Sequence, residues 1–157
     1  MPARARFDIM YVPILTLHSI LRWVVVLSGV WAVVAARRAA GRSPWTAGDA
    51  RPGLLFVLAI DIQLLLGLAL YLAASPITRA AIADIGAAMS SSPMRFWAVE
   101  HPAAMILAVV FAHLGRTLGR TPSPGRRVFI WYGLALLAIL AATPWPFMPQ
   151  ARPWVRI

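Results

Sequence analysis

The 157-residue chain contains no cysteine and no lysine. Without cysteine it forms no disulfide, no thiolate zinc site, no iron–sulfur cluster and no covalently attached c-type haem. Without lysine it cannot hold retinal or pyridoxal phosphate as a Schiff base. Charge is scarce as well, because charged residues make up 13% of the chain, against about 25% in an ordinary soluble domain.

Hydrophobic residues make up 61% of the chain, and the mean hydropathy is +0.74. Lipid is therefore the expected solvent for most of it. Four apolar runs are predicted to cross the bilayer as helices, which takes about 20 residues each: 13–36, 52–74, 93–114 and 128–142. The length suits one compact unit. The sequence predicts a single domain, 1–157, that is an all-α integral membrane four-helix bundle with an interfacial tail, 143–157.

The net charge is +10, and all of the positive side-chain charge is carried by arginine. Most arginines cluster in the first and third connections between the apolar runs: Arg37, Arg38, Arg42, Arg51, Arg116, Arg120, Arg126 and Arg127. Cytoplasmic loops are enriched in basic residues. Both termini are therefore expected on the extracytoplasmic side of a bacterial inner (cytoplasmic) membrane. Short clusters between apolar runs also argue against a nucleic-acid surface.

Two histidines are expected at matching depth on helices that run in the same direction. His18 in the first run and His101 in the third each fall about 9 Å outward of the middle of the helix, at 1.5 Å per residue. Axial ligation of a b-type haem needs two imidazoles at one level, on opposite faces of the porphyrin. The pattern predicts His18 and His101 as iron ligands, with hydrogen-bonded packing of each histidine as the alternative. His113 lies elsewhere around the third helix and is expected at the interface.

Two charged residues are expected near the middle of the membrane. Arg22 and Asp61 lie on neighbouring antiparallel helices and are predicted to form a buried ion pair, because either charge alone is costly in lipid. The alternative is that Arg22, one turn from His18, neutralises a haem propionate or a quinone oxygen.

Two further polar residues are candidates for the same site. Glu100 is adjacent to His101 and is expected to accept an imidazole N–H; the alternative is a proton-accepting role near an outer quinol site. Gln63 shares one helical stripe with Gly67 and Tyr71. Core packing is the default interpretation of that stripe, and a polar contact from Gln63 to a cofactor is the alternative.

Most of the chain resembles small bacterial four-helix membrane proteins labelled "cytochrome B". The similar segments are His18-Ser19, Leu21-Arg22-Trp23, Asp61-Ile62-Gln63, Leu66-Gly67-Leu68, Tyr71, Arg95-Phe96, Glu100-His101-Pro102, Met105, Gly115-Arg116, Tyr132-Gly133 and Pro144-Trp145. The most distinctive is Glu100-His101-Pro102 in its apolar context. The resemblance implies the four-helix architecture and haem b, and it carries over to His18 and His101 but not to His113.

The leading hypothesis is a b-type cytochrome-like membrane subunit that relays electrons between a quinone pool and a redox partner. No residue set indicates hydrolysis or group transfer, so a part in an enzyme would rest on a partner subunit. The alternative is a cofactor-free accessory subunit of a larger respiratory or photosynthetic membrane complex. A small transporter or proton channel using Arg22, Asp61 and Glu100 is a weaker third hypothesis, because the chain has no inverted repeat.

Overall fold

The computed structural model describes residues 3–42, 44–121 and 125–154, with side chains from residue 9 onward. Within these ranges regular structure is entirely helical, as the sequence predicts. Three helical stretches are long and apolar enough to cross a membrane: Ile9–Ala39, Ala47–Ala74 and Ser92–Leu118. Their length and composition indicate a membrane protein whose helices are surrounded by lipid.

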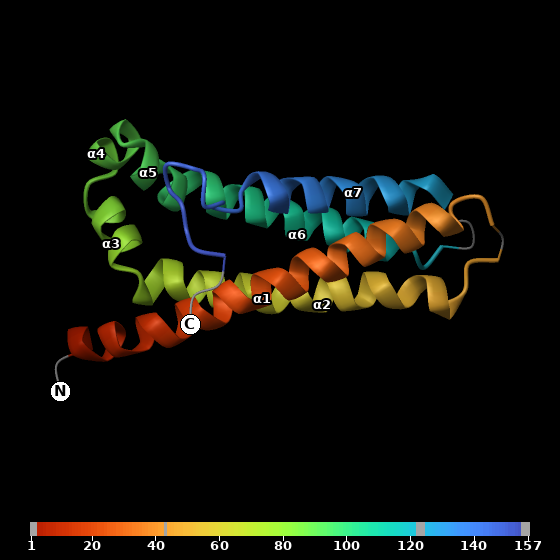
Figure 1. Ribbon diagram of the computed structural model, residues 1–157, viewed down its shortest axis with the longest axis horizontal. Helices are drawn as coiled ribbons and strands as arrows, with labels where there is room; N and C mark the ends of the chain where they lie inside the picture. Colours follow the sequence, from red (N-terminus) through yellow and green to blue (C-terminus); the bar gives the residue numbers. More distant parts are fainter. Residues whose placement is uncertain (1–2, 43, 122–124, 155–157) are drawn as a thin grey trace.

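The first two long helices, α1 (Ala3–Ala39) and α2 (Ala47–Ala69), lie side by side and antiparallel (Figure 1). A capping box starts α2. Thr46 Oγ1 accepts the Asp49 N–H at 3.3 Å, and the Asp49 carboxylate accepts the Thr46 N–H at 3.0 Å. These bonds satisfy N–H groups that the first turn of a helix leaves free. Arg42 adds a 2.8 Å ion pair to Asp49, which ties the connection to the helix start.

Two π-helical turns interrupt the regular helices at the end of the bundle opposite the α1–α2 connection. The elements there are η1 (Leu70–Ala74), α3 (Pro76–Ala83), α4 (Ile85–Ser90), α5 (Ser92–Arg95), η2 (Phe96–Glu100) and α6 (His101–Leu118). Each π turn is followed within two residues by a proline, Pro76 or Pro102. A proline lacks the N–H and crowds the carbonyl four residues back, so the regular ladder is broken there. Such π turns are frequent at functional sites.

The helices α6 and α7 (Gly125–Ala141) form a second antiparallel pair, and α7 also packs on α1. One core links α1, α2, α6 and α7, and small buried residues bring the helices close together: Ala32, Ala36, Ala59, Ala108, Ala112 and Ala135. Tyr132 of α7 occupies space left by two glycines, Gly53 of α2 and Gly115 of α6. Close packing through small residues is the usual basis of helix association in lipid.

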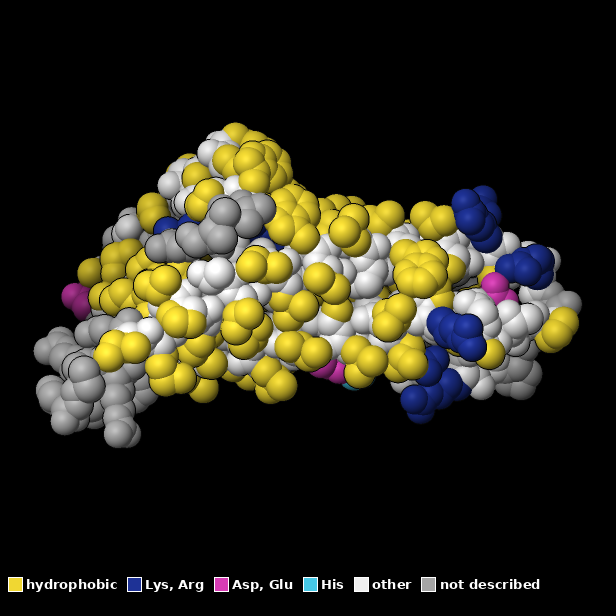
Figure 2. Space-filling model, turned by 60° about the horizontal axis from the view of Figure 1, so that its bottom comes forward, with side chains coloured by type: hydrophobic (Ala, Val, Ile, Leu, Met, Phe, Trp, Pro, Cys, Tyr) yellow, Lys and Arg dark blue, Asp and Glu magenta, His cyan; other side chains and the backbone are white. Residues whose placement is uncertain are grey.

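The two ends of the molecule differ in charge. Figure 2 shows arginines gathered at one end and hydrophobic side chains along the length between the ends. The α1–α2 and α6–α7 connections, which carry the predicted arginine clusters, lie at this arginine end (Figure 1). The short helices α3, α4 and α5 lie at the opposite end, called the tail end below because the chain leaves α7 there. The two arginine-rich connections therefore lie at the same end of the fold, as the sequence predicts.

The tail that follows α7 folds back toward α1 (Figure 1). The carbonyl oxygen of Trp154 accepts hydrogen bonds from Arg22 Nη2 at 2.7 Å and Trp23 Nε1 at 2.8 Å. The rings of Trp23, Trp145 and Trp154 pack together, with centroids between 5.7 and 6.3 Å apart. These contacts hold the tail against α1. Residues 155–157 of the predicted tail lie outside the described residues.

Candidate functional site

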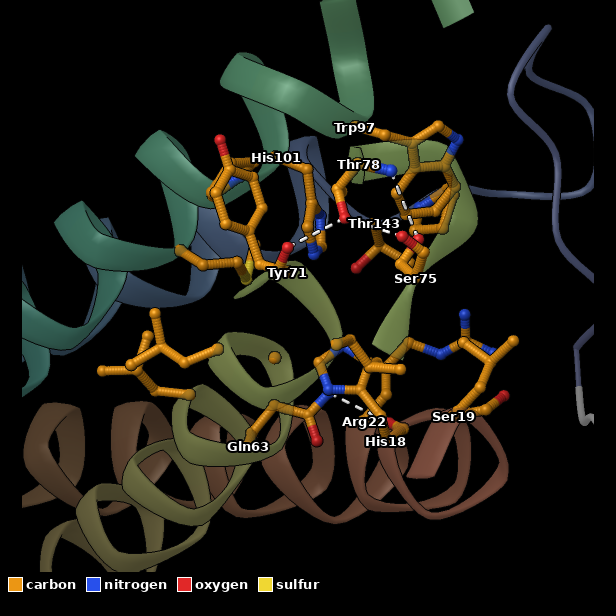
Figure 3. Close-up of a pocket in the computed structure, with 18 of the residues that line it drawn as sticks. His18, Ser19, Arg22, Gln63, Tyr71, Ser75, Thr78, Trp97, His101 and Thr143 are labelled. Atoms are coloured by element: carbon orange, nitrogen blue, oxygen red, sulfur yellow. Dashed lines mark hydrogen bonds between the residues drawn. The ribbon is translucent and has the colours of Figure 1, made fainter. Parts of the chain in front are cut away.

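A cavity of about 490 Å³ lies inside the tail end of the bundle, between α1, η1, α2 and α6 and under the tail. Four of the five predicted site residues line it: His18, Arg22, Gln63 and His101. Most of the other lining residues are apolar, with Tyr71, Ser75, Thr78 and Trp97 grouped near His101 (Figure 3). Sites that hold a small molecule or a cofactor usually measure about 300–1,000 Å³ and have this mostly apolar character.

The two predicted iron ligands lie on opposite sides of this cavity (Figure 3). The ring centroids of His18 and His101 are 6.4 Å apart and their planes meet at 71°. A metal–imidazole bond of about 2 Å, with the nitrogen about 1.1 Å from its ring centre, places two in-line ligands about 6.3 Å apart, centre to centre. The observed centroid separation is close to this value. It also brings the two residues to one level, as their depth predicts.

The orientation of the His101 ring leaves one nitrogen available. Its Nδ1 lies 2.8 Å from the carbonyl oxygen of Ala142. Because a carbonyl only accepts, Nδ1 carries the proton of this bond and Nε2 retains its lone pair. A metal-ligating histidine is commonly held in this way, with its second ring nitrogen donating to a backbone carbonyl. Phe96 and Trp97 pack against the ring, with centroids 5.7 and 5.6 Å from it.

The prediction that Glu100 accepts the imidazole N–H of His101 is wrong, whereas its alternative, a proton-accepting role near an outer quinol site, stays a prediction. The Glu100 carboxylate accepts a 2.7 Å hydrogen bond from Arg95 Nε, and Ala142 takes the position beside the His101 ring. Glu100 does not line the cavity. Adjacent residues of a helix point in directions about 100° apart, so neighbours in sequence do not meet on one face.

The predicted stripe on α2 does face the cavity. Gln63 Nε2 donates a 3.0 Å hydrogen bond to the backbone oxygen of His18, which joins α2 to α1. Gly67 lies directly beside the imidazole, because an added Cβ would be 3.3 Å from His18 Cε1. Gln63 is buried, in agreement with core packing, and it also borders the cavity; its contact to a cofactor stays a prediction.

The predicted ion pair between Arg22 and Asp61 is wrong. Arg22 Nη2 donates to the carbonyl oxygens of Pro153 and Trp154, whereas Asp61 pairs with His113 at 2.9 Å. Asp61 is two residues from Gln63, which places the two side chains about 200° apart around α2. Since Gln63 points into the cavity, Asp61 points to the outside of the bundle.

Arg152 is a cavity residue that the sequence did not directly indicate. It lies in the tail, lines the cavity and has its guanidinium 4.8 Å from the centre of the Trp97 ring. With Arg22 it brings two cations to the tail end of an apolar cavity. Paired guanidinium groups are suited to binding carboxylates. The signal in the sequence was the tail's predicted place at the same membrane face as His18 and His101.

Tyr71 and Pro102 join the two π turns across the cavity. Pro102 has no N–H to donate to the carbonyl oxygen of Ala98, four residues earlier. The Tyr71 hydroxyl donates to that oxygen instead, at 2.8 Å. The backbone oxygen of Tyr71 in turn accepts from Thr78 Oγ1 at 2.9 Å. The proline therefore frees a carbonyl that the tyrosine uses to connect η1 with η2.

We expect Tyr71→Phe to reduce the free energy of unfolding by about 1 kcal/mol, because it leaves the Ala98 carbonyl without its donor. Thermal unfolding of the detergent-purified protein, followed by circular dichroism, measures the change. Tyr11→Phe is the matched control, since Tyr11 also lines the cavity. Equal midpoints for the Tyr71 and Tyr11 variants would show that the bond between the π turns contributes no net stability.

Several buried polar atoms of the cavity have no partner among the described residues: His18 Nδ1, Arg22 Nε, Gln63 Oε1 and Arg152 Nε. Buried polar groups are normally satisfied, so their grouping at one cavity indicates a polar or charged ligand. Two imidazoles on opposite walls, an apolar lining and two arginines are the residues of this cavity that could hold a haem and its two carboxylates. Comparisons with models of protein families, with curated proteins and with solved structures find no match to this chain.

Proposed function

We propose that this protein is a b-type cytochrome-like membrane subunit in which His18 and His101 hold haem b. The observation that carries the proposal is the 6.4 Å separation of the two ring centroids across a cavity. The resemblance to the "cytochrome B" proteins, which rests on Glu100-His101-Pro102 among other segments, supports the same cofactor. In this proposal the subunit relays electrons between a quinone pool and a redox partner.

Haem supplies one-electron chemistry at its iron when it is bound. The residues of this chain position it and control its surroundings. The Ala142 carbonyl fixes the His101 tautomer, so that Nε2 keeps its lone pair. Arg22 and Arg152 supply positive charge for two carboxylates at the tail end. The apolar walls exclude water, which favours the less charged state of a redox centre.

We propose further that α7 is a fourth membrane span, which makes the molecule a four-helix bundle with both termini outside the cytoplasm. The 17 residues of α7 form a helix about 26 Å long, at 1.5 Å per residue. This length is close to the thickness of the hydrocarbon core of a bilayer, about 30 Å. The arginine end would face the cytoplasm of a bacterial cell, in agreement with the positive-inside tendency. The cavity and the tail would then lie near the outer face, where an extracytoplasmic redox partner has access.

An optical spectrum of the full-length protein, purified from membranes of cells supplied with haem precursor, tests the cofactor. We expect a reduced-minus-oxidised difference spectrum with the Soret and alpha bands of low-spin haem b, at one haem per chain. Extraction of the haem into pyridine identifies it as haem b. A haem-free preparation that co-purifies at fixed stoichiometry with large redox subunits would overturn the proposal in favour of the accessory-subunit alternative.

A further inference from the structure

A hydrogen-bonded histidine–aspartate pair lies on the outside of the bundle at the depth of the hydrocarbon. His113 Nε2 and Asp61 Oδ1 are 2.9 Å apart, and their side chains are 50% and 39% exposed. Asp61 falls within about 1 Å, along the helix axis, of the middle of the span Ala47–Ala74. Ionisable side chains at this depth are costly in lipid and almost always face protein or water. A half-exposed pair here indicates that another protein surface covers it.

Asp61 also takes the place of a leucine in a regularly spaced series of leucines on α2. Leu54, Leu58, Leu65 and Leu68 are all exposed, and together with Asp61 they are spaced alternately by four and three residues. This alternation is the a/d repeat by which two helices pack along a common seam. A single polar residue within such a seam sets the register and the number of chains.

We propose that a second copy of this chain covers this face, with the two α2 helices parallel along the leucine seam. Copies inserted with the same topology are related by a two-fold axis along the membrane normal. A two-fold contact uses the same patch twice, so the two copies of Asp61 meet across the axis, each still bonded to His113 of its own chain. The polar pair of each copy is then covered by the same pair of the other copy at the same depth.

The Asp61–His113 pairs supply a driving force for association that the leucines alone lack. Leucine packs against lipid as well as against leucine, so apolar contact gives little drive for association inside a bilayer. Polar contacts between helices do favour association there, and the second copy removes the exposed pair from hydrocarbon. Neither Asp61 nor His113 lines the cavity, so the dimer does not depend on the haem proposal.

Cysteine cross-linking in native membranes tests the seam. The chain has no cysteine of its own, so Leu58→Cys and Leu65→Cys each introduce one thiol. Around a two-fold axis between parallel α2 helices, each thiol faces the same thiol of the second copy. A disulfide needs Cα atoms less than about 7 Å apart. We expect both variants to give a covalent dimer with a mild oxidant. Leu27→Cys on α1, which is also exposed, is the control and should stay monomeric.

A second variant tests the role of the Asp61–His113 pair. In the Leu58→Cys background, Asp61→Leu with His113→Leu should reduce the cross-linked fraction at limiting expression by about tenfold, while the helix content by circular dichroism stays unchanged. The proposal is overturned if neither seam cysteine cross-links, if Leu27→Cys cross-links equally, or if the double leucine change leaves the dimer intact. A disulfide to a different protein at Leu58→Cys would also overturn it, by identifying another occupant of this face.

Discussion

If His18 and His101 hold haem b as proposed, His101→Ala is expected to remove most of the haem b spectrum from the purified protein, and His18→Ala is expected to do the same. Each change would delete one of the two protein ligands proposed for the iron. Loss of an outer hydrogen-bond partner of a metal ligand already costs about 10- to 100-fold in affinity, so loss of the ligand itself should cost more. The haem content per chain, measured by pyridine extraction, reports the effect.

His113→Ala is the matched control for this prediction. His113 is on the same helix as His101, but it contacts Asp61 on the outside of the bundle and does not line the cavity. Its replacement should leave the haem content within about a factor of two of the unchanged protein, because the ligand set is intact. Full retention of the spectrum in both His18→Ala and His101→Ala would contradict the assignment of these residues as ligands.

Gly115→Ala is expected to destabilise the bundle by about 2–3 kcal/mol, the upper part of the usual cost of overpacking a core. An added Cβ would lie 2.5 Å from Cε1 of Tyr132. The ring cannot move away freely, since it also contacts Gly53 on α2, where a Cβ would lie 2.0 Å from the tyrosine hydroxyl oxygen. The unfolding midpoint in a detergent titration measures the loss.

Gly133→Ala separates this clash from the general effect of removing a glycine. Gly133 lies on α7 next to Tyr132, and nothing is within 4 Å of an added Cβ there. Alanine favours a helix over glycine by about 1 kcal/mol, so this control should be neutral or stabilising. Tyr132→Leu in the Gly115→Ala background should restore part of the loss. A Gly115→Ala protein as stable as the Gly133→Ala protein would contradict the packing described for Tyr132.

The long helices could be read from the sequence because their signals are local. Apolar runs and flanking arginines locate them along the chain, and prolines such as Pro52 and Pro93 lie near their starts. The matching depth of His18 and His101 follows from counting residues along two helices of the same direction. The structure places both rings at one cavity, with Arg22 and Gln63 beside them.

The errors concern direction around a helix axis. Glu100 next to His101, and Asp61 at the depth of Arg22, were both assigned partners by position along the chain. In the structure Glu100 bonds Arg95, and Asp61 bonds His113 on the outer face. A difference of one or two residues rotates a side chain by about 100° or 200°. Only the packing of the helices against each other decides which of those directions is inside.

By itself the sequence determined the helical class of this protein, the apolar segments long enough to span a membrane, of which the structure shows three, and the position of each polar residue along them. All of these follow from composition and from a constant rise per residue. The tertiary structure alone decided which side chains share the cavity, that the tail brings Arg152 to it, and that Asp61 and His113 face outward. The reason is physical, because helix rotation and tail position are set by contacts between residues far apart in the chain, such as Arg22 with Trp154 and Tyr132 with Gly53 and Gly115.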